Sequence, residues 1–141
     1  MLYDPGLVQP MRDELARLGV RELRTAEEVE EVLEVNDGTT LLVVNSVCGC
    51  AARNARPAVA IALEHSAQPN HVVTVFAGQD LEATARAREY LAGFRPSSPA
   101  IGLLRDGEVV FMLERHQIEG REAEAIAQDI ANAFDTYCVA A

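Results

Sequence analysis

Residues 39–45, TTLLVVN, lead directly into Ser46-Val47-Cys48-Gly49-Cys50. The run of seven does not alternate between apolar and polar residues, which predicts a central strand covered on both faces. An Ala-rich helix is predicted to follow, from about residue 50 to residue 64, with an interruption at Pro57. In open α/β sheets, functional sites form where a strand ends and the chain turns into a helix. The two cysteines therefore lie where such a site is expected.

Turn and capping signals divide the rest of the chain into further helices and strands. Four more helices are predicted, over residues 5–18, 26–35, 80–91 and 120–137. Four more strands are predicted, over residues 20–23, 71–77, 99–105 and 108–114. The last two flank Asp106-Gly107, a strong hairpin signal. Strands that alternate with helices predict a parallel core with right-handed crossovers, to which the hairpin adds an antiparallel edge. We therefore expect a single three-layer α/β domain over residues 1–141.

Several helix starts are predicted in detail. Asp4 is expected to cap the first helix, and Pro10 is expected to kink or restart it. Thr25 and Glu28 have the spacing of a capping box. Asp80 is in place to cap the helix that follows it.

Composition excludes several classes of protein. The chain has 141 residues, of which 49% are hydrophobic and 24% charged, a globular balance rather than a disordered or fibrous one. The net charge of −10 argues against nucleic-acid and anionic-membrane partners, which require a basic face. Neither a signal peptide nor an apolar run of about 20 residues is visible. We therefore expect a cytoplasmic protein, in which two neighbouring cysteines are redox-active or bind metal.

Cys48 is the better candidate nucleophile of the pair. It precedes the predicted helix, whose free N–H groups and partial positive charge favour an anion such as a thiolate. A cysteine in this setting can have its pKa lowered from about 8.5 to roughly 3.5–7.5. Cys50 lies nearer the helix body and could resolve a mixed disulfide. Arg53 and Arg56 could add positive potential, although we expect both to be solvated helix residues.

The Cys-Gly-Cys spacing favours a disulfide that takes part in thiol–disulfide exchange over a stable structural disulfide. A disulfide between Cys48 and Cys50 would close a very small, strained and easily reduced ring. Gly49 would relieve part of this strain by tolerating unusual backbone angles. Two alternatives remain open: a pair of inert buried thiols, and a metal site. The metal site is less favoured because two thiolates leave two positions of a tetrahedral zinc site to fill.

Other candidate residues lie further along the chain. Ser98-Pro99 opens a strand that should start near the same end of the sheet as Cys48; on sequence physics alone, Pro99 is a simple strand opener. Cys138 falls on the apolar stripe of the last helix, which favours a packed thiol over a secondary resolving thiol. The three histidines show no ligand spacing, and only His116, after the hairpin, stays a candidate.

Taken together, these residues carry a resemblance to the bacilliredoxin family, small bacterial proteins of thioredoxin-like fold with Cys-Gly-Cys in place of Cys-x-x-Cys. The resemblance covers nearly the whole chain. It rests on residues 43–51 (VVNSVCGCA), 96–99 (PSSP), 115–120 (RHQIEG) and 133–138 (AFDTYC).

The resemblance implies more than the spacing does. It implies a thioredoxin-like sandwich with a mixed central sheet and an extra N-terminal helix, and a cis Pro99 beside the cysteines. It implies thiol–disulfide exchange that removes bacillithiol from protein cysteines, with Cys48 as nucleophile and Cys50 as resolving thiol. The implied partners are bacillithiolated or disulfide-bearing proteins and a low-molecular-weight thiol with its reductase. Bacillithiol would be a co-substrate, and no tightly bound cofactor or metal is expected. Disulfide reductase or isomerase activity is an alternative, as is a metal-binding module.

Overall fold

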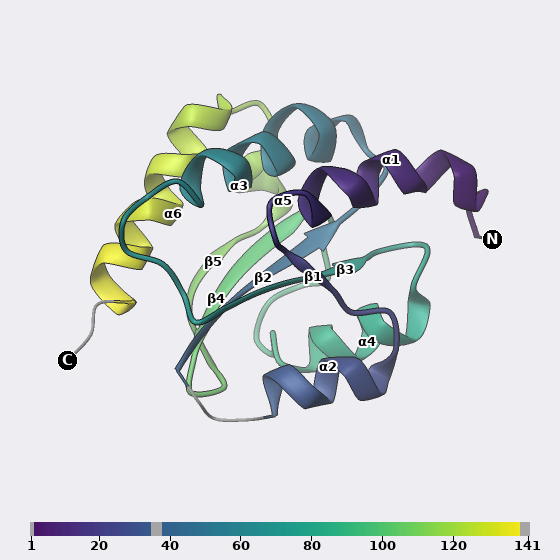
Figure 1. Ribbon diagram of the computed structural model, residues 1–141, viewed down its shortest axis with the longest axis horizontal. Coiled ribbons are helices and arrows are strands. Elements are labelled where there is room, and N and C mark those ends of the chain that lie inside the picture. The colour runs from purple at the N-terminus through teal and green to yellow at the C-terminus, as the bar shows by residue number, and fades with distance from the viewer. Residues whose placement is uncertain (1, 35–37, 139–141) are drawn as a thin grey trace.

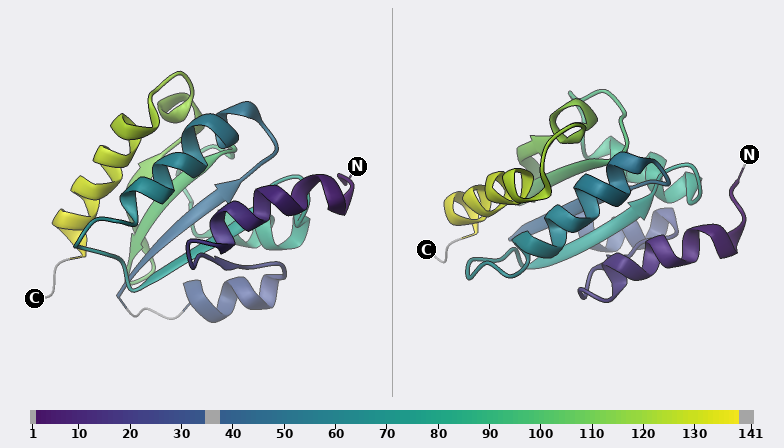
Figure 2. Two further views of the ribbon diagram at one scale, coloured as in Figure 1. Left: turned by 45° about the horizontal axis from the view of Figure 1, so that its top comes forward. Right: turned by 90° about the horizontal axis from the view of Figure 1, so that it is seen from above.

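The computed structural model describes residues 2–34 and 38–138. It shows a five-stranded sheet between two layers of helices (Figures 1 and 2). The order across the sheet is β1-β3-β2-β4-β5; β1 and β2 are parallel to β3, β4 is antiparallel to β2, and β5 to β4. The strands are β1 (Arg21–Glu22), β2 (Thr39–Asn45), β3 (His71–Phe76), β4 (Ala100–Arg105) and β5 (Glu108–Leu113).

Strand β2 occupies the centre of the sheet, as its unbroken apolar pattern predicted. All seven of its residues are buried. Because successive side chains of a strand point to opposite faces, Leu41 and Val43 enter one hydrophobic cluster while Leu42 and Val44 enter the other. The strand therefore joins both halves of the core, and its carboxyl end is held rigidly on both sides.

Helices cover both faces of the sheet (Figure 2). The face of Leu41 is covered by α1 (Pro5–Ala16), α3 (Arg56–Ala62) and α6 (Ala123–Tyr137). The opposite face is covered by α2 (Ala26–Leu33) and α4 (Leu81–Glu89). Among the described residues, no helix is long and apolar enough to cross a membrane.

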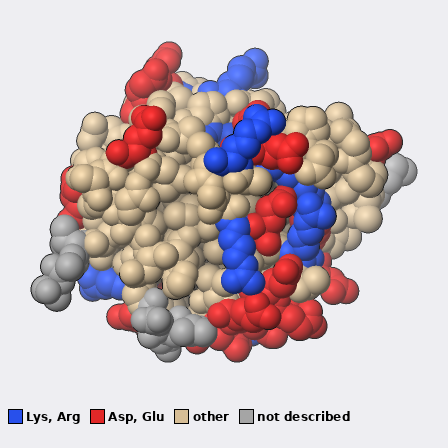
Figure 3. All heavy atoms as spheres, in the orientation of Figure 1, with Lys and Arg blue, Asp and Glu red and all other residues tan. Residues whose placement is uncertain are grey.

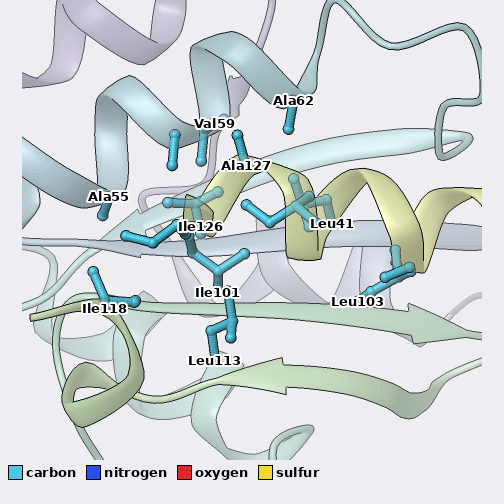
Figure 4. Close-up of a cluster of buried hydrophobic side chains, with 14 of the residues drawn as sticks. Leu41, Ala55, Val59, Ala62, Ile101, Leu103, Leu113, Ile118, Ile126 and Ala127 are labelled. Carbon is cyan, nitrogen blue, oxygen red and sulfur yellow. The ribbon is translucent and has the colours of Figure 1, made fainter. Parts of the chain in front are cut away.

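The larger hydrophobic cluster lies between β2, β4 and the first set of helices. In Figure 4, Leu41 and Ile101 of the sheet meet Val59 of α3 and Ile126 of α6, and all four are inaccessible to solvent. Burial of one such side chain contributes about 1.5–3 kcal/mol relative to exposure. This packing fixes α3, and with it the segment that follows the cysteines.

The predicted helix starts are partly correct. The Asp4 carboxylate accepts a 2.7 Å hydrogen bond from the Gly6 N–H, and α1 then runs through Pro10 as one element, which corrects the predicted restart. Thr25 Oγ1 accepts the Glu28 N–H at 3.1 Å, so the predicted cap is confirmed. The Glu28 carboxylate accepts from the Arg24 N–H instead of completing the box on Thr25.

Asp80 does not cap α4. Its two carboxylate oxygens accept from the buried Arg12 guanidinium at 2.7 and 3.0 Å. A bidentate pair with arginine is stronger than a single bond to a backbone N–H, which explains why Asp80 forms the ion pair. The prediction of a cap was therefore wrong, and Asp80 instead ties α1 to the start of α4.

The remaining differences concern element boundaries. The first helix ends at Ala16 rather than residue 18, and β1 has only two residues. The predicted last helix begins at Ala123, and a separate short helix, α5 (Arg115–Ile118), precedes it. The predicted end of the second helix, at residue 35, lies outside the described residues.

Candidate active site

The two cysteines lie on the turn that leaves the carboxyl end of β2. This turn leads into η1 (Ala51–Ala55), a π-helical turn in which the Arg56 N–H bonds to the Ala51 carbonyl. Pro57 follows at the start of α3. Because proline has no N–H to donate and its ring crowds the preceding turn, it favours a local departure from α-helical hydrogen bonding. The predicted interruption at Pro57 is thus confirmed. All three cysteines of the chain are free thiols, and each is half-buried.

Donors converge on the Cys48 sulfur. Its partial burial acts to raise the pKa of Cys48, because a thiolate is less stable away from water. Neighbouring polar groups oppose this and lower the pKa: the Ala51 N–H, the Cys50 thiol and N–H, and the Ser46 hydroxyl. Their combined effect is larger, so the pKa of Cys48 lies below its ordinary value. The predicted helix-end environment is therefore present around this sulfur.

Cys50 is shifted in the opposite direction. Burial raises the pKa of Cys50, and so does the neighbouring Cys48 sulfur. The Cys50 thiol donates to the Glu119 carboxylate, with 3.3 Å between Cys50 Sγ and Glu119 Oε2. The negative charge of this carboxylate disfavours a thiolate at Cys50. The pKa values of the two sulfurs are therefore shifted in opposite directions, and Cys48 is the more readily ionised of the pair.

Sequence reasoning missed two charged residues beside the cysteines, Arg115 and Glu119. Arg115 Nε lies 3.0 Å from Glu119 Oε2, and Arg115 Nη2 lies 3.9 Å from Cys50 Sγ. The ion pair holds the pKa of the Glu119 carboxyl below its usual range. These residues are four apart on and just after α5, a spacing that favours pairing across one helical turn. The sequence shows that the two residues are four apart. It does not show that α5 packs next to the cysteines, which is what brings the pair to Cys50.

Ser98 and Pro99 lie at the same end of the sheet. Ala100, which follows them, pairs with Val44 near the carboxyl end of β2. The Ser98–Pro99 peptide bond is cis, as the resemblance implies, and Pro99 is buried. Arg115 Nη1 also reaches the Ser98 carbonyl, at 3.4 Å. This arginine therefore connects the segment before β4 with the cysteine pair.

Comparisons with known proteins agree on a family. A family model described as disulphide isomerase matches residues 3–138. A bacilliredoxin from Salinibacter ruber is 57% identical over 98% of this chain and 82% of the relative. Bacilliredoxins from Geobacillus kaustophilus and Shouchella clausii are 56% and 55% identical, over 96% and 94% of this chain and 94% and 92% of the relatives.

The chain belongs to the bacilliredoxin family. Solved structures agree with the fold that this family implies. A Fasciola hepatica thioredoxin superposes with a TM-score of 0.56 at 18% identity, covering 84% of this chain and 99% of that one. A Halobacterium salinarum thioredoxin gives 0.55 at 19% identity, covering 86% and 92%. The fold is thioredoxin-like, and the protein is a thiol–disulfide oxidoreductase.

In this bacilliredoxin, Arg56 is a structural residue of the cysteine turn. Only 3% of its side chain is exposed, so the expectation of a solvated residue was wrong. It donates to Glu14 at 2.7 Å, to Asn45 Oδ1 at 2.9 Å and to the Ser46 carbonyl at 3.0 Å. Ser46 Oγ in turn accepts the Cys48 N–H at 3.2 Å. Arg53, three residues earlier, is exposed as expected.

Gly49 does not adopt a left-handed conformation in this bacilliredoxin. Its φ is not positive, unlike that of six other glycines among the described residues. A Cβ at this position would lie 2.8 Å from Arg53 Nη2, the flexible end of an exposed side chain. Neither the backbone conformation nor the space around residue 49 therefore requires a glycine while the two thiols are free. The predicted relief of strain concerns the Cys48–Cys50 disulfide and stays a prediction.

Cys138 is not brought to the other two cysteines of this bacilliredoxin. It lies after α6 and contacts the Thr39 hydroxyl, at the first residue of β2. The length of that strand, roughly 20 Å, separates Thr39 from the cysteine turn. Burial raises the pKa of Cys138. The packed-thiol interpretation fits this position better than a secondary resolving thiol does.

The positions of the three histidines bear on the alternative of a metal site. His65 pairs with Asp135 at 2.8 Å, His71 is exposed at the start of β3, and His116 is exposed on α5. Within residues 2–34 and 38–138, no group of three or more His, Cys, Asp or Glu side chains is arranged to hold a metal ion.

Proposed function

We propose that this bacilliredoxin removes bacillithiol from protein cysteines that carry it as a mixed disulfide, in the cytoplasm. The opposite pKa shifts of Cys48 and Cys50, together with the hydrogen bond from the Cys50 thiol to Glu119, carry the proposal. Two titratable groups whose environments push their pKa values apart have distinct acid–base roles. Here one sulfur attacks while the other stays protonated until it is needed.

In the first step, Cys48 thiolate attacks the bacillithiol sulfur of the mixed disulfide. A new S–S bond forms between Cys48 and bacillithiol, and the S–S bond to the substrate protein breaks. Its electron pair leaves on the substrate cysteine, which takes a proton from solvent. Cys48 favours this step because the Ala51 N–H and the Ser46 hydroxyl stabilise its thiolate before the substrate arrives.

In the second step, Cys48 is released from its bacillithiol cap. Free bacillithiol can attack the cap as thiolate, giving bacillithiol disulfide and Cys48 thiolate. Alternatively, Cys50 loses its proton and attacks Cys48, which forms the Cys48–Cys50 disulfide and expels bacillithiol as thiolate. The Glu119 carboxylate, 3.3 Å from Cys50 Sγ, is exposed and in position to relay that proton to solvent. On the second route, two molecules of bacillithiol reduce the Cys48–Cys50 disulfide by two further exchanges. Both routes then yield bacillithiol disulfide, which a reductase for the low-molecular-weight thiol returns to bacillithiol.

The test uses a Cys50→Ser variant, which stops the reaction after the first step. The variant is mixed with a bacillithiolated test protein, and its mass and cysteine-containing peptides are measured. We expect one bacillithiol on Cys48 and a free thiol on the test protein. Cys138→Ser is the control, with unchanged transfer. If Cys48 takes up neither bacillithiol nor glutathione, supplied on a glutathionylated protein, the proposal is wrong.

The description of the matching family model favours a second candidate, disulfide isomerisation. The reduction potential of the Cys48–Cys50 couple separates the two functions. An oxidising potential favours isomerisation, and a more reducing one favours removal of thiol caps. Equilibration with a glutathione redox buffer series measures it.

A further inference from the structure

A groove of about 610 Å³ opens beside the cysteine pair, between the segment before β4 and α5. Two of its lining residues also contact Cys50. Arg115 Nη2 lies 3.9 Å and Glu119 Oε2 3.3 Å from Cys50 Sγ. A small molecule in this groove therefore lies next to the sulfur atoms that take part in exchange. Its polar lining consists of Arg95, Ser97, Glu114, Arg115, His116 and Glu119.

The lining of this groove holds two arginines and two glutamates, so its formal charge is balanced, and its capacity for an anion depends on which arginine is unpaired. The Glu114 side chain accepts the Gln117 N–H as the cap of α5. Glu119 is occupied by Arg115 and Cys50. Within residues 2–34 and 38–138, no carboxylate forms an ion pair with Arg95, which is exposed. Its guanidinium is available to an anion from solvent.

A second unneutralised arginine lies beneath the same loop. Arg88 of α4 lines a small enclosed cavity together with Arg95, Pro96 and Ser97. Its Nη2 donates to the Ser97 carbonyl at 3.3 Å, and its buried Nε has no partner in the described part of the chain. Burial lowers the pKa of Arg88, as expected for a cation removed from water without a counterion. The positive charge of Arg88 therefore lies directly beneath residues 95–97.

A second groove, which Cys50 itself lines, is more acidic. It has a volume of about 460 Å³ and is lined by three glutamates, Glu119, Glu122 and Glu124, with Arg53 and Arg121. Arg121 is already paired with Asp129 at 2.9 Å. The chain as a whole carries −10, and Figure 3 shows acidic side chains gathered around α2. Of the two grooves beside Cys50, the one lined by Arg95 is therefore the less acidic.

We propose that the groove of Arg95, Arg115 and His116 binds the carboxylate-bearing part of the small thiol whose disulfide Cys48 attacks. This inference rests on the proposed function and adds to it the residues of a subsite for the small thiol. Arg95 and His116 bind the carboxylate, and Arg115 keeps the bound molecule beside the sulfurs. The exchange itself is unchanged: Cys48 thiolate forms the new S–S bond, and the electron pair of the broken bond leaves on the other sulfur.

The test compares three small symmetrical disulfides that differ in charge. These are 3,3′-dithiodipropionate with two carboxylates, 2-hydroxyethyl disulfide with no charge, and cystamine with two ammonium groups. Rate constants for mixed-disulfide formation on Cys48 are measured by mass spectrometry in a Cys50→Ser, Cys138→Ser background. Each is divided by the rate constant of the same disulfide with dithiothreitol, which removes differences in intrinsic reactivity.

We expect the dianionic disulfide to react about threefold or more faster than the neutral one on this normalised scale. Arg95→Gln should slow the dianionic disulfide by about three- to tenfold and leave the neutral one within about twofold. Arg95→Lys should retain most of the rate because it keeps the charge. Arg105→Gln is the matched control, since Arg105 lies at the other end of β4, opposite Thr39, and it should change none of the rates.

Two results would overturn the assignment of the groove. One is equal normalised rates for the dianionic and neutral disulfides in the background protein. The other is equal slowing of all three disulfides by Arg95→Gln. Either result leaves the exchange reaction of Cys48 intact, so the proposed function survives it. If none of the three disulfides reacts at Cys48, the proposed function fails together with the groove.

Discussion

The Cys50 thiol donates a hydrogen bond to the Glu119 carboxylate, with 3.3 Å between Sγ and Oε2. Glu119 is also paired with Arg115, so the carboxylate stays ionised beside the thiol. An ionised acceptor stabilises the protonated form of Cys50 and repels its thiolate. This relationship explains how two cysteines only two residues apart can differ in protonation.

Glu119→Gln should therefore lower the pKa of Cys50. The glutamine removes the negative charge and leaves Arg115 free to interact with the sulfur. In a Cys48→Ser, Cys138→Ser background, the alkylation rate of Cys50 against pH should shift to lower pH by about one unit. Glu122→Gln, three residues away and without a contact to Cys50, should leave the profile unchanged. An identical profile in both variants would show that Glu119 has no influence on this thiol.

Arg56 supports the cysteine turn from inside the protein. Arg56→Gln removes donors from Glu14, Asn45 and Ser46, and buried acceptors without a partner are costly. We expect the free energy of unfolding to fall by about 2 kcal/mol, measured as a lower urea midpoint.

The same substitution should also act on reactivity, because Ser46 holds the Cys48 N–H. The alkylation profile of Cys48 should move to higher pH as the turn loosens. Arg53→Gln on the same segment, where the side chain is exposed, should alter neither the urea midpoint nor the profile. A lower midpoint with an unmoved profile would limit Arg56 to a role in stability.

The sequence was sufficient for the sheet and the cysteine turn. Strand β2 was predictable because residues 41–44 are apolar in succession. Successive side chains of a strand point to opposite faces of the sheet, so such a run is buried on both faces. The Asp106-Gly107 signal identified the β4–β5 hairpin, and Gly107 has the positive φ that such a turn requires. The position of Cys48 followed from these elements, since the carboxyl end of β2 fixes where the chain enters the helix.

The residues that complete the site were not predictable in this way. Helix α5 has only four residues, and its cap is formed by Glu114 and Gln117 rather than by serine or threonine. Such a segment has too few turns to show a helical period. Arg56 has the appearance of a surface residue until α1 supplies Glu14 as its partner. In each case a contact distant in sequence, which local pattern does not encode, decides the role of the residue.

Asp80 shows the same limit and gives a third prediction. Asp80→Asn removes the charge that pairs with Arg12, a side chain that is 7% exposed and also faces the Phe76 ring at 5.2 Å. Breaking this buried pair leaves Arg12 with only Glu22, at the longer distance of 3.6 Å, so we expect a loss of about 2–3 kcal/mol. Asp129→Asn, which breaks the exposed pair with Arg121, should cost less than about 1 kcal/mol. Equal urea midpoints for the two variants would contradict this difference.

The pH dependence of alkylation gives a direct test of the attacking sulfur. Reactivity follows the thiolate, so the rate for each cysteine rises with pH through its own pKa. The pKa of Cys48 is lowered, whereas those of Cys50 and Cys138 are raised. A short pulse of iodoacetamide at pH 7, followed by peptide mapping, should label Cys48 well before the other two. The Cys48 rate should reach half its maximum at a lower pH than the rates of the other two cysteines do.

Substitution of Cys50 separates the causes of that low pKa. Cys50→Ala removes the side-chain donor to the Cys48 sulfur and should move the Cys48 profile to higher pH. Cys50→Ser keeps a donor at the same position and should move it less. The backbone N–H groups of residues 50 and 51 remain in both variants, so Cys48 should stay more reactive than Cys138. If Cys48 and Cys138 have superimposable profiles in the unsubstituted chain, the turn does not activate its cysteine, and the attacking role of Cys48 is wrong.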